Sequence, residues 1–365
     1  MNTGNHPNDV IAEVRGQLGL ITLNRPRALN ALSLGMVRTL AATLQAWRDD
    51  PAVLAVVVRG TGKEDAFGSF CAGGDIRFFH AAALAGDSTL GDFFTEEYSL
   101  NHLIATYPKP YIALMDGIVM GGGMGISQGA SLRVVTERTK MAMPETGIGL
   151  FPDVGGSYFL SRCPGRVGEY LALTGLTIGS AEAIAWGLAD GHVSAGELPV
   201  IWNKLVATPF ESSAAVEHWL RTRFAAPAAK KAGHAAIDAV FGLASVQAIV
   251  DALAADASDW ARDTLALLRK RSPLMLHVVL AQIRRGRSMG LADALRMERD
   301  MVHQCFHLRP GAASETVEGI RALAIDKDHQ PQWNPAQIED VQPADVAAFF
   351  NSPWPADQHP LRQLG

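Results

Sequence analysis

The apolar and polar positions of the first 200 residues follow strand and helix patterns in alternation. Leu54–Val58 and Tyr111–Met115 are uninterrupted apolar runs, as expected for strands that are buried on both faces. Between Leu34 and Trp47 the apolar positions recur at helical spacing, and Ser33 is placed to cap that helix. Because strands and helices alternate, the pattern predicts an α/β fold in which helices flank a mainly parallel sheet.

The other segments of this region extend the alternation. Strands are predicted at Val10–Val14, Leu18–Leu23, Leu132–Val135 and Met141–Met143, and Gly191–Val193 closes the pattern. Helices are predicted from Ile76 onward and at Phe93–Thr106, Gly123–Gly129, Asp153–Arg162, Arg166–Thr174 and Ser180–Trp186.

The pattern changes near residue 200. Strand patterns stop, and alanine-rich helical patterns are found at Ala235–Ala255, Ser258–Arg269, Pro273–Gly286 and Leu291–Leu308. Ala225–Gly233 has the composition of a linker or loop, and the tail from Asp326 to Gly365 is expected to wrap the surface. We therefore expect a core in residues 1–200 that holds the active site, and a helical region with its tail in residues 201–365.

Composition narrows the class of protein. A hydrophobic content of 48% allows a sizeable core, and a net charge of −5 provides no basic surface for nucleic acid. The three cysteines lie far apart in sequence, which is typical of a reducing compartment rather than a disulfide framework. The first ten residues are polar, and no apolar stretch has the length of a membrane span, so we expect a cytoplasmic protein without membrane contact.

Two glycine-rich loops follow two of the buried strands, at Gly73-Gly74 and Gly121–Gly123. Ligands bind at the carboxyl ends of parallel strands, so we expect the two loops to meet at one site. The backbone amides of Gly74 and Gly122 could then bind one carbonyl oxygen, although tight packing would also explain the glycines. Asp75 is expected to cap the helix that follows it.

Two carboxylates, Glu145 and Asp153, lie in mainly apolar sequence. Desolvation raises the pKa of such a carboxyl group and suits it to acid–base or nucleophilic work. A buried structural glutamate and a helix-capping aspartate are the alternatives. Of Glu96 and Glu97, at most one can face the same site, because adjacent helical residues point in different directions.

His303, Cys305 and His307 have the residue types of a metal site. On a helix, His303 and His307 share a face and Cys305 does not, and no further ligands lie nearby in sequence. We therefore expect no metal there. Cys71 is expected to be a small buried residue.

Several segments together resemble the enoyl-CoA hydratase/isomerase (crotonase) superfamily, and within it most resemble the 3-hydroxyisobutyryl-CoA hydrolases. The resemblance covers residues 10 to 335. The segments that carry it are LITLNRPRALNALS, FCAGGDIR, FFTEEYSLN, PKPYIALMDGIVMGGGMG, MPETGIGLFPDVGG, LRMERD and EGIRALAIDKDHQPQW.

The resemblance implies a crotonase-like spiral of ββα units with a helical C-terminal region. It implies hydrolysis of 3-hydroxyisobutyryl-CoA in valine breakdown, with no cofactor, since CoA is part of the substrate. It also implies an acyl-CoA ligand and a possible homo-oligomer through the C-terminal helices. The implied site consists of catalytic Glu145 and Asp153, an oxyanion hole at Gly74 and Gly122, substrate-contacting Glu97, and a CoA-binding region at Arg27, Ala28, Leu29, Asp75, Ile76 and Arg77.

Two departures from the family pattern bear on the reaction. Gly125 stands where the resemblance implies a glutamate in hydratases, which argues against hydration, while Asp153 favours the hydrolases. The segment Glu315–Gly319 departs from the hydrolase pattern, so its role is open. An enoyl-CoA isomerase, or a hydratase, and a non-catalytic acyl-CoA-binding protein remain the alternatives.

Overall fold

A computed structural model describes residues 8–225 and 234–365, in which the chain forms two compact units that interleave along the sequence. The first, the sheet unit, comprises Met1–Gly74, Ser99–Ala142 and Thr177–Ala232. The second, the helical unit, comprises Asp75–Tyr98, Met143–Leu176 and Gly233–Gly365. The predicted linker lies, apart from Ala225, outside the described residues, and the division expected at residue 200 stays a prediction.

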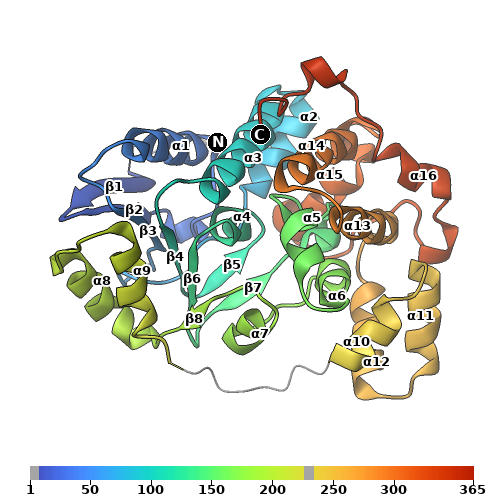
Figure 1. The fold of residues 1–365 in the computed structure, drawn as a ribbon. Coiled ribbons are helices and arrows are strands. Elements are labelled where there is room, and N and C mark those ends of the chain that lie inside the picture. The colour runs from blue at the N-terminus through green and yellow to red at the C-terminus, as the bar shows by residue number, and fades with distance from the viewer. Residues whose placement is uncertain (1–7, 226–233) are drawn as a thin grey trace. The chain divides into compact units, whose positions relative to one another are not determined.

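The sheet unit contains every strand found among the described residues. Its main sheet has six strands in the order β1-β2-β3-β4-β6-β8, in which only the β1–β2 pair is antiparallel (Figure 1). A second sheet pairs two strands, β5 and β7, in parallel. The predicted α/β class with a mainly parallel sheet is therefore confirmed. The strands are β1 Val10–Arg15, β2 Leu18–Leu23, β3 Ala55–Gly60, β4 Tyr111–Met115, β5 Ile118–Met120, β6 Leu132–Val135, β7 Lys140–Ala142 and β8 Gly191–His192.

Both faces of the main sheet are covered within this unit. Leu18 and Leu20 of β2 belong to a buried cluster that includes side chains from α8 (Leu198–Ala207) and α9 (Ser213–Arg221). Gly19 points to the opposite face, where an added Cβ would lie 2.4 Å from the ring of Trp47 on α1 (Leu34–Arg48). The predicted cap of α1 is confirmed, since the Ser33 hydroxyl accepts a hydrogen bond of 3.2 Å from the Met36 amide. The unit also contains α4 (Gly122–Gln128) and α7 (Ser180–Ala185).

The helical unit is built from helices that come from both halves of the sequence. They are α2 Ile76–Ala85, the first part of α3 (Thr89–Ala105), α5 Gly156–Phe159, α6 Val167–Thr174, α10 His234–Phe241, α11 Val246–Ala255, α12 Asp259–Leu268, α13 Pro273–Gly286, α14 Leu291–His307, α15 Glu315–Ile320 and α16 Pro343–Ala348. In the C-terminal tail, α16 lies against α13.

Two helix predictions in this unit were wrong. The segment expected to form a single helix at Ala235–Ala255 forms α10 and α11, because Gly242 ends the first and the Ser245 hydroxyl caps the second through the Ala248 amide. The helix expected from Asp153 begins only at Gly156, because the preceding Val154 and Gly155 have left-handed φ values of 52° and 89°. α5 ends at Phe159, and the chain continues directly into a 3-10 helix at Leu160–Arg162.

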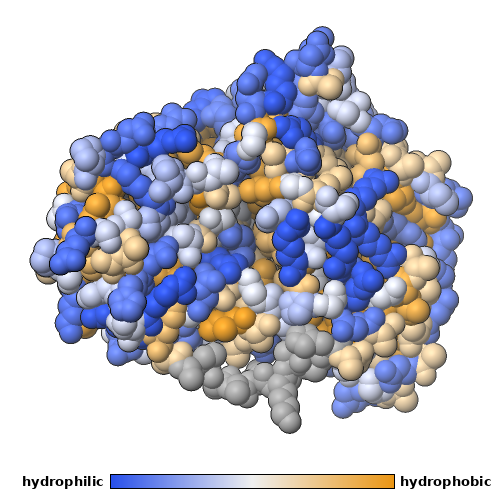
Figure 2. Space-filling view, viewed as in Figure 1, coloured by the Kyte–Doolittle hydropathy of each residue, from blue (hydrophilic) through white to orange (hydrophobic). Residues whose placement is uncertain are grey.

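The character of the surface and of the helices bears on whether a chain can span a membrane. Figure 2 shows hydrophilic and hydrophobic residues interspersed over the visible face. Among residues 8–225 and 234–365, no helix combines the length and the apolar character needed to cross a bilayer.

Candidate active site

The two glycine loops of the sheet unit meet, as the sequence predicts. The Cys71 amide donates to the carbonyl of Ile118, and the Met120 amide donates to the carbonyl of Cys71, each at 3.0 Å. A Cβ added to Gly73 would lie 3.7 Å from the Gly122 nitrogen. The backbone of the first loop therefore runs directly beside the start of α4.

The amides of Gly74 and Gly122 are available to a ligand. Gly122 is the first residue of α4, so its N–H lies at the free amino end of that helix. Within the described part of the chain, neither amide donates a backbone hydrogen bond. Gly123 has a packing role instead, since a Cβ there would lie 2.2 Å from the Cys71 carbonyl oxygen. Cys71 itself is fully buried, as expected.

The expected CoA-binding residues lie in two places. Arg27 and Ala28 belong to a turn at Pro26–Ala28, and Leu29 follows with a left-handed φ of 50°. The Leu29 carbonyl accepts a hydrogen bond of 3.0 Å from the Ala72 amide, which holds this turn against the first glycine loop. In the helical unit, Asp75 caps α2 through the Phe78 amide at 3.4 Å, which confirms the capping prediction. Ile76 and the exposed Arg77 are the first residues of that helix.

Three carboxylates are buried together with a tyrosine in the helical unit. Glu97 on α3, Glu145 and Asp153 are between 2% and 6% exposed. The Tyr98 hydroxyl donates a hydrogen bond of 2.8 Å to Asp153 Oδ2. Tyr98 was not singled out from the sequence, although it follows Glu97 directly. Glu96 is only half-buried.

Burial raises the pKa of each carboxyl group in this cluster. The pKa of Asp153 is raised to about 6 by desolvation, against the opposing effect of the Tyr98 hydrogen bond. Desolvation raises the pKa of Glu145 well above its ordinary value, the charge of Asp153 adds to this, and Arg271 opposes it. The pKa of Glu97 is raised by desolvation and by both other carboxylates. Each of the three carboxyl groups therefore keeps its proton to a higher pH than an exposed carboxyl group does.

Two carboxylate oxygens of the cluster have no hydrogen-bond donor. Glu97 Oε1 and Glu145 Oε2 are buried and lack a partner among the described residues. Buried acceptors are normally satisfied, because an unmade hydrogen bond costs free energy. These two oxygens are therefore the ones free to contact a substrate or a water molecule.

The turn that carries Asp153 is held by a residue that sequence reasoning missed. Glu298 on α14 is fully buried, and its carboxylate accepts hydrogen bonds from the amides of Gly155 at 2.7 Å and Ser157 at 2.8 Å. The alternative in which Asp153 caps the helix does not hold, because Glu298 bonds these amides while Asp153 bonds Tyr98. A signal was present, since Glu298 falls at helical spacing among the apolar residues of the buried face of α14.

The segment Glu315–Gly319, whose sequence departs from the hydrolase pattern, supports the turn that carries Glu145. Gly149 ends that turn with a φ of 66°, and a Cβ there would lie 2.2 Å from the Glu315 carbonyl oxygen. The Thr316 hydroxyl donates to the Gly149 carbonyl at 2.7 Å. The Glu315 carboxylate accepts from the Ser272 hydroxyl and from the Asn334 amide. The segment therefore has a structural role despite its altered sequence.

The histidines of α14 lie as helical spacing predicts. The rings of His303 and His307 stack with centroids 3.7 Å apart, and Cys305 is buried on another face. In residues 8–225 and 234–365, no group of three or more potential ligand side chains is arranged to hold a metal ion.

Comparison with known proteins identifies relatives over nearly the whole chain. A family profile described as Enoyl-CoA hydratase/isomerase matches residues 18–350. The chain is 41% identical over 344 residues to the Xenopus tropicalis protein named "3-hydroxyisobutyryl-CoA hydrolase, mitochondrial". The alignment covers 92% of this chain and 87% of the relative. It is 39% identical over 350 residues to the Arabidopsis thaliana protein named "Probable 3-hydroxyisobutyryl-CoA hydrolase 3", covering 93% of this chain and 91% of the relative.

A solved structure has the same fold under a different name. A carnitinyl-CoA dehydratase from Mycobacterium thermoresistibile superposes with a TM-score of 0.86 at 39% sequence identity. The match covers 97% of this chain and 99% of that one. The names of the relatives therefore agree on the acyl-CoA class of substrate and differ on the reaction.

Proposed function

This chain belongs to the enoyl-CoA hydratase/isomerase family and has its crotonase-type fold, and from this premise we propose that it hydrolyses 3-hydroxyisobutyryl-CoA to 3-hydroxyisobutyrate and CoA, a step of valine breakdown. The observation that carries the proposal is the buried Glu145, which has one carboxylate oxygen without a donor among the described residues. Relatives at 39–41% identity bear the hydrolase name, which supports this reaction over the alternatives.

The thioester carbonyl oxygen is bound by the backbone amides of Gly74 and Gly122. Attack on the carbonyl carbon moves negative charge onto this oxygen, and the two N–H groups stabilise that charge. Each such donor contributes on the order of 3 kcal/mol to lowering the barrier. Both amides are free of backbone partners among the described residues, which supports this role.

Glu145 supplies the attacking oxygen or generates it. In one route its carboxylate attacks the carbonyl carbon, the carbon–sulfur bond breaks, and CoA leaves as the thiolate. Water then hydrolyses the resulting mixed anhydride to restore Glu145 and release the acid. In the other route Glu145 takes a proton from a water molecule, and that water attacks directly. Both routes need Glu145 ionised at the moment of attack.

Asp153 and Glu97 act on the acyl part and on the proton transfers. Asp153 binds the 3-hydroxyl group of the substrate or the water molecule, and Tyr98 keeps its carboxylate oriented. Glu97 contacts the substrate through its partnerless oxygen. The adenosine end of CoA binds near Arg27–Leu29 and Asp75–Arg77. The reaction as proposed needs no metal and no redox cofactor.

A hydratase or isomerase is the second candidate, because a structural relative is named as a dehydratase. Hydration by two carboxylates is disfavoured by Gly125, which is a buried residue of α4 and has no side chain to act as an acid or base. Isomerisation needs only one carboxylate, and Glu145 could serve. A chain that binds acyl-CoA without turnover is the third candidate.

The test is release of the CoA thiol from 3-hydroxyisobutyryl-CoA, followed with a thiol-trapping dye, with crotonyl-CoA in parallel. Turnover of about 1 s⁻¹ or faster on the hydroxyacyl substrate alone is expected. An absorbance change on crotonyl-CoA without thiol release would establish a hydratase. Migration of the double bond in a 3-enoyl-CoA would establish an isomerase, and tight binding without either reaction would establish a binding protein.

The proposal includes the cellular compartment of the protein and its association into a homo-oligomer. Three buried free cysteines are compatible with the reducing cytoplasm, whereas the Xenopus relative carries the word mitochondrial in its name. Cell fractionation decides between the two compartments. Association of the chain through its C-terminal helices is testable by light scattering.

A further inference from the structure

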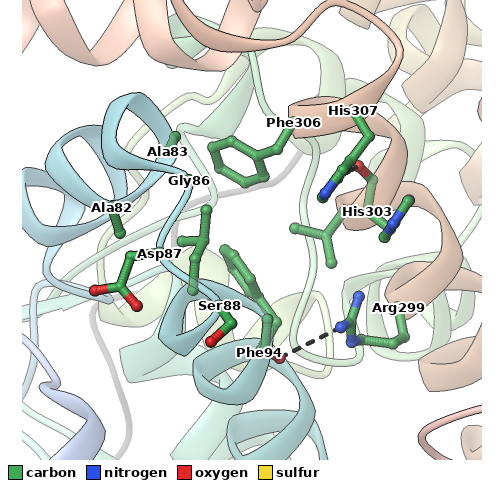
Figure 3. Close-up of a pocket in the computed structure, with 13 residues that line it drawn as sticks. Ala82, Ala83, Gly86, Asp87, Ser88, Phe94, Arg299, His303, Phe306 and His307 are labelled. Atoms are coloured by element: carbon green, nitrogen blue, oxygen red, sulfur yellow. Dashed lines mark hydrogen bonds between the residues drawn. The ribbon is translucent and has the colours of Figure 1, made fainter.

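A cavity of about 340 Å³ lies in the helical unit, and none of the proposed catalytic carboxylates lines it. It is formed between the turn that joins α2 to α3 and one face of α14 (Figure 3). Nothing in the proposed reaction uses it. Its size is that of a small-molecule site.

The base of this cavity holds a buried cation that forms no salt bridge with the described residues. Arg299 is 6% exposed, and its guanidinium donates to the Thr95 hydroxyl at 2.9 Å and to the Gly91 carbonyl at 3.3 Å. Both acceptors are neutral. No carboxylate of the described residues forms a salt bridge with it. The charges of Asp300 and Asp92 act on it from a greater distance, and the Trp354 ring centroid lies 4.7 Å from the guanidinium carbon. A buried charge is normally paired, because removing it from water is costly.

A ring nitrogen of His303, near Arg299, lacks a hydrogen-bond partner in the described part of the chain. His303 Nδ1 is buried and has no hydrogen-bond partner among the described residues. Burial, His307 and Arg299 lower the pKa of His303 to about 4, so the ring is neutral at neutral pH. A neutral imidazole can donate through Nδ1 if that nitrogen carries the proton. Figure 3 shows His303 and Arg299 on the same side of the cavity.

The rest of the base is apolar, and the rim is open. Phe94, Val302 and Phe306 are buried in it, whereas Gly86, Asp87 and Ser88 of the rim are exposed. The Asp87 carboxylate accepts hydrogen bonds from the amide and hydroxyl of Thr89, and in Figure 3 it lies across the cavity from Arg299. The base thus offers one cation, one neutral donor and aliphatic and aromatic walls.

We propose that this cavity is a binding site for a short-chain carboxylic acid in its anionic form. The carboxylate pairs with the Arg299 guanidinium and accepts a hydrogen bond from His303, and the aliphatic carbons contact Phe94, Val302 and Phe306. An anion in the cavity gives the buried arginine a direct ion pair, in a charge-assisted hydrogen bond. A neutral ligand of the same shape would not form this ion pair. The inference stands without the proposed thioester hydrolysis.

The test compares isobutyrate with isobutyramide by titration calorimetry on the full chain. The two probes have nearly the same shape and differ in charge. We expect isobutyrate to bind at least about tenfold more tightly than isobutyramide. Equal affinity of the two probes would overturn the proposal, and this comparison needs no variant.

Two variants then place the binding in this cavity. Arg299→Met removes the charge and retains much of the side-chain volume, and we expect it to weaken isobutyrate binding about tenfold or more. The control is Arg296→Met on the same helix, whose guanidinium bonds Asp293 and the C-terminal tail outside the cavity, and we expect unchanged binding. Val302→Phe fills the cavity and leaves the charge in place, and we expect it to abolish binding.

Each variant is first checked for a native thermal transition. If Arg299→Met does not fold, the affinity of Val302→Phe for isobutyrate decides whether the acid binds in this cavity. If Val302→Phe does not fold, the affinity of Arg299→Met decides. Wild-type affinity for isobutyrate in either folded variant would show that the acid binds elsewhere and would overturn the proposal. Because binding is measured with free acids, a failure of the proposed hydrolysis would leave these results unchanged.

Discussion

At the scale of single residues, Asp153 and Glu145 are carboxylates whose surroundings oppose ionisation. Burial raises both pKa values, and the negative charge of Asp153 raises the pKa of Glu145 further. A carboxylate that is hard to ionise is a stronger base and nucleophile once it has lost its proton. The proposed chemistry therefore depends on the environment as much as on the residue types.

Glu145→Gln is expected to lower thiol release from 3-hydroxyisobutyryl-CoA by about a thousandfold or more, because the amide can neither attack nor take a proton. The fold should persist, since glutamine is isosteric and removes a costly buried charge. The matched control is Glu197→Gln at an exposed position, for which turnover should be unchanged. Near wild-type turnover in the Glu145 variant would remove it from the mechanism.

Tyr98→Phe is expected to move the pH profile of kcat/KM to higher pH. The Tyr98 hydroxyl lowers the pKa of Asp153 by stabilising its ionised form, so its removal raises that pKa above about 6. If ionised Asp153 is required, activity begins to fall at a higher pH in the variant than in the wild type. The measurement is kcat/KM between about pH 5 and pH 8. Superimposable profiles would mean that Asp153 is not required in its ionised form.

The sequence identified part of the carboxylate cluster and could not identify the rest. Glu145, Asp153 and Glu97 stand out because carboxylates are rare in apolar sequence, and all three are buried together. Tyr98 was overlooked because a tyrosine on an apolar helix face is common in any core. Glu298 was overlooked because its partner amides lie 141 and 143 residues away, a distance that local spacing does not encode.

At the scale of elements, the predictions were most accurate where one pattern extends over a whole segment. Tyr111–Met115 and Pro273–Gly286 were predicted to the residue. β5 was missed because its three residues, Ile118–Met120, run directly into the glycine loop. The break between α10 and α11 was missed because helix-favouring alanines surround Gly242 and Ser245.

The turn after Asp153 depends on α14, so its geometry can be changed from a distance. Glu298→Gln has one acceptor oxygen instead of two and must direct its NH₂ group at the amide of Gly155 or Ser157. We expect kcat on the thioester to fall about tenfold with KM nearly unchanged, because Asp153 is displaced while binding groups elsewhere stay in place.

The control for this variant is Asp293→Asn on the exposed side of α14, where the carboxylate pairs with Arg296 at the surface. Its kinetics should match those of the wild type. An increase in KM without a change in kcat for the Glu298 variant would contradict a role in positioning Asp153.

At the scale of the whole molecule, the buried carboxylates make stability depend on pH. The pKa of Asp153 is raised in the folded state, so its favourable contribution is complete below its unfolded value of 3.8 and is lost as pH rises through about 6. Glu298, with a pKa raised to about 8, adds a further loss at higher pH. The free energy of unfolding should therefore decrease from pH 5 to pH 8 in this chain.

Asp153→Asn is expected to remove part of this dependence. The variant should gain stability relative to the wild type as pH rises from about 5 to about 7, by on the order of 1 kcal/mol. The measurement is urea unfolding at each pH, with Asp340→Asn at the exposed surface as the control. A stability difference that does not change with pH would show that Asp153 is not desolvated in the folded chain.

The order of elements along the chain was predictable, and the way distant segments join was not. Hydrophobic patterns predict each strand and helix from its own residues. They do not show that α2 and the residues around Glu145 and Asp153 belong to the same compact unit as α13 and α14. That grouping depends on pairings such as Gln282 with Pro152 and Glu298 with Gly155.

These pairings set an order of events during synthesis. Glu298 follows Gly155 by 143 positions, and Gln282 follows Pro152 by 130. A ribosome adds residues from the amino end, so the Asp153 turn is made long before the side chains that hold it have left the exit tunnel. A nascent chain released before α14 can contain every proposed catalytic residue and still be inactive.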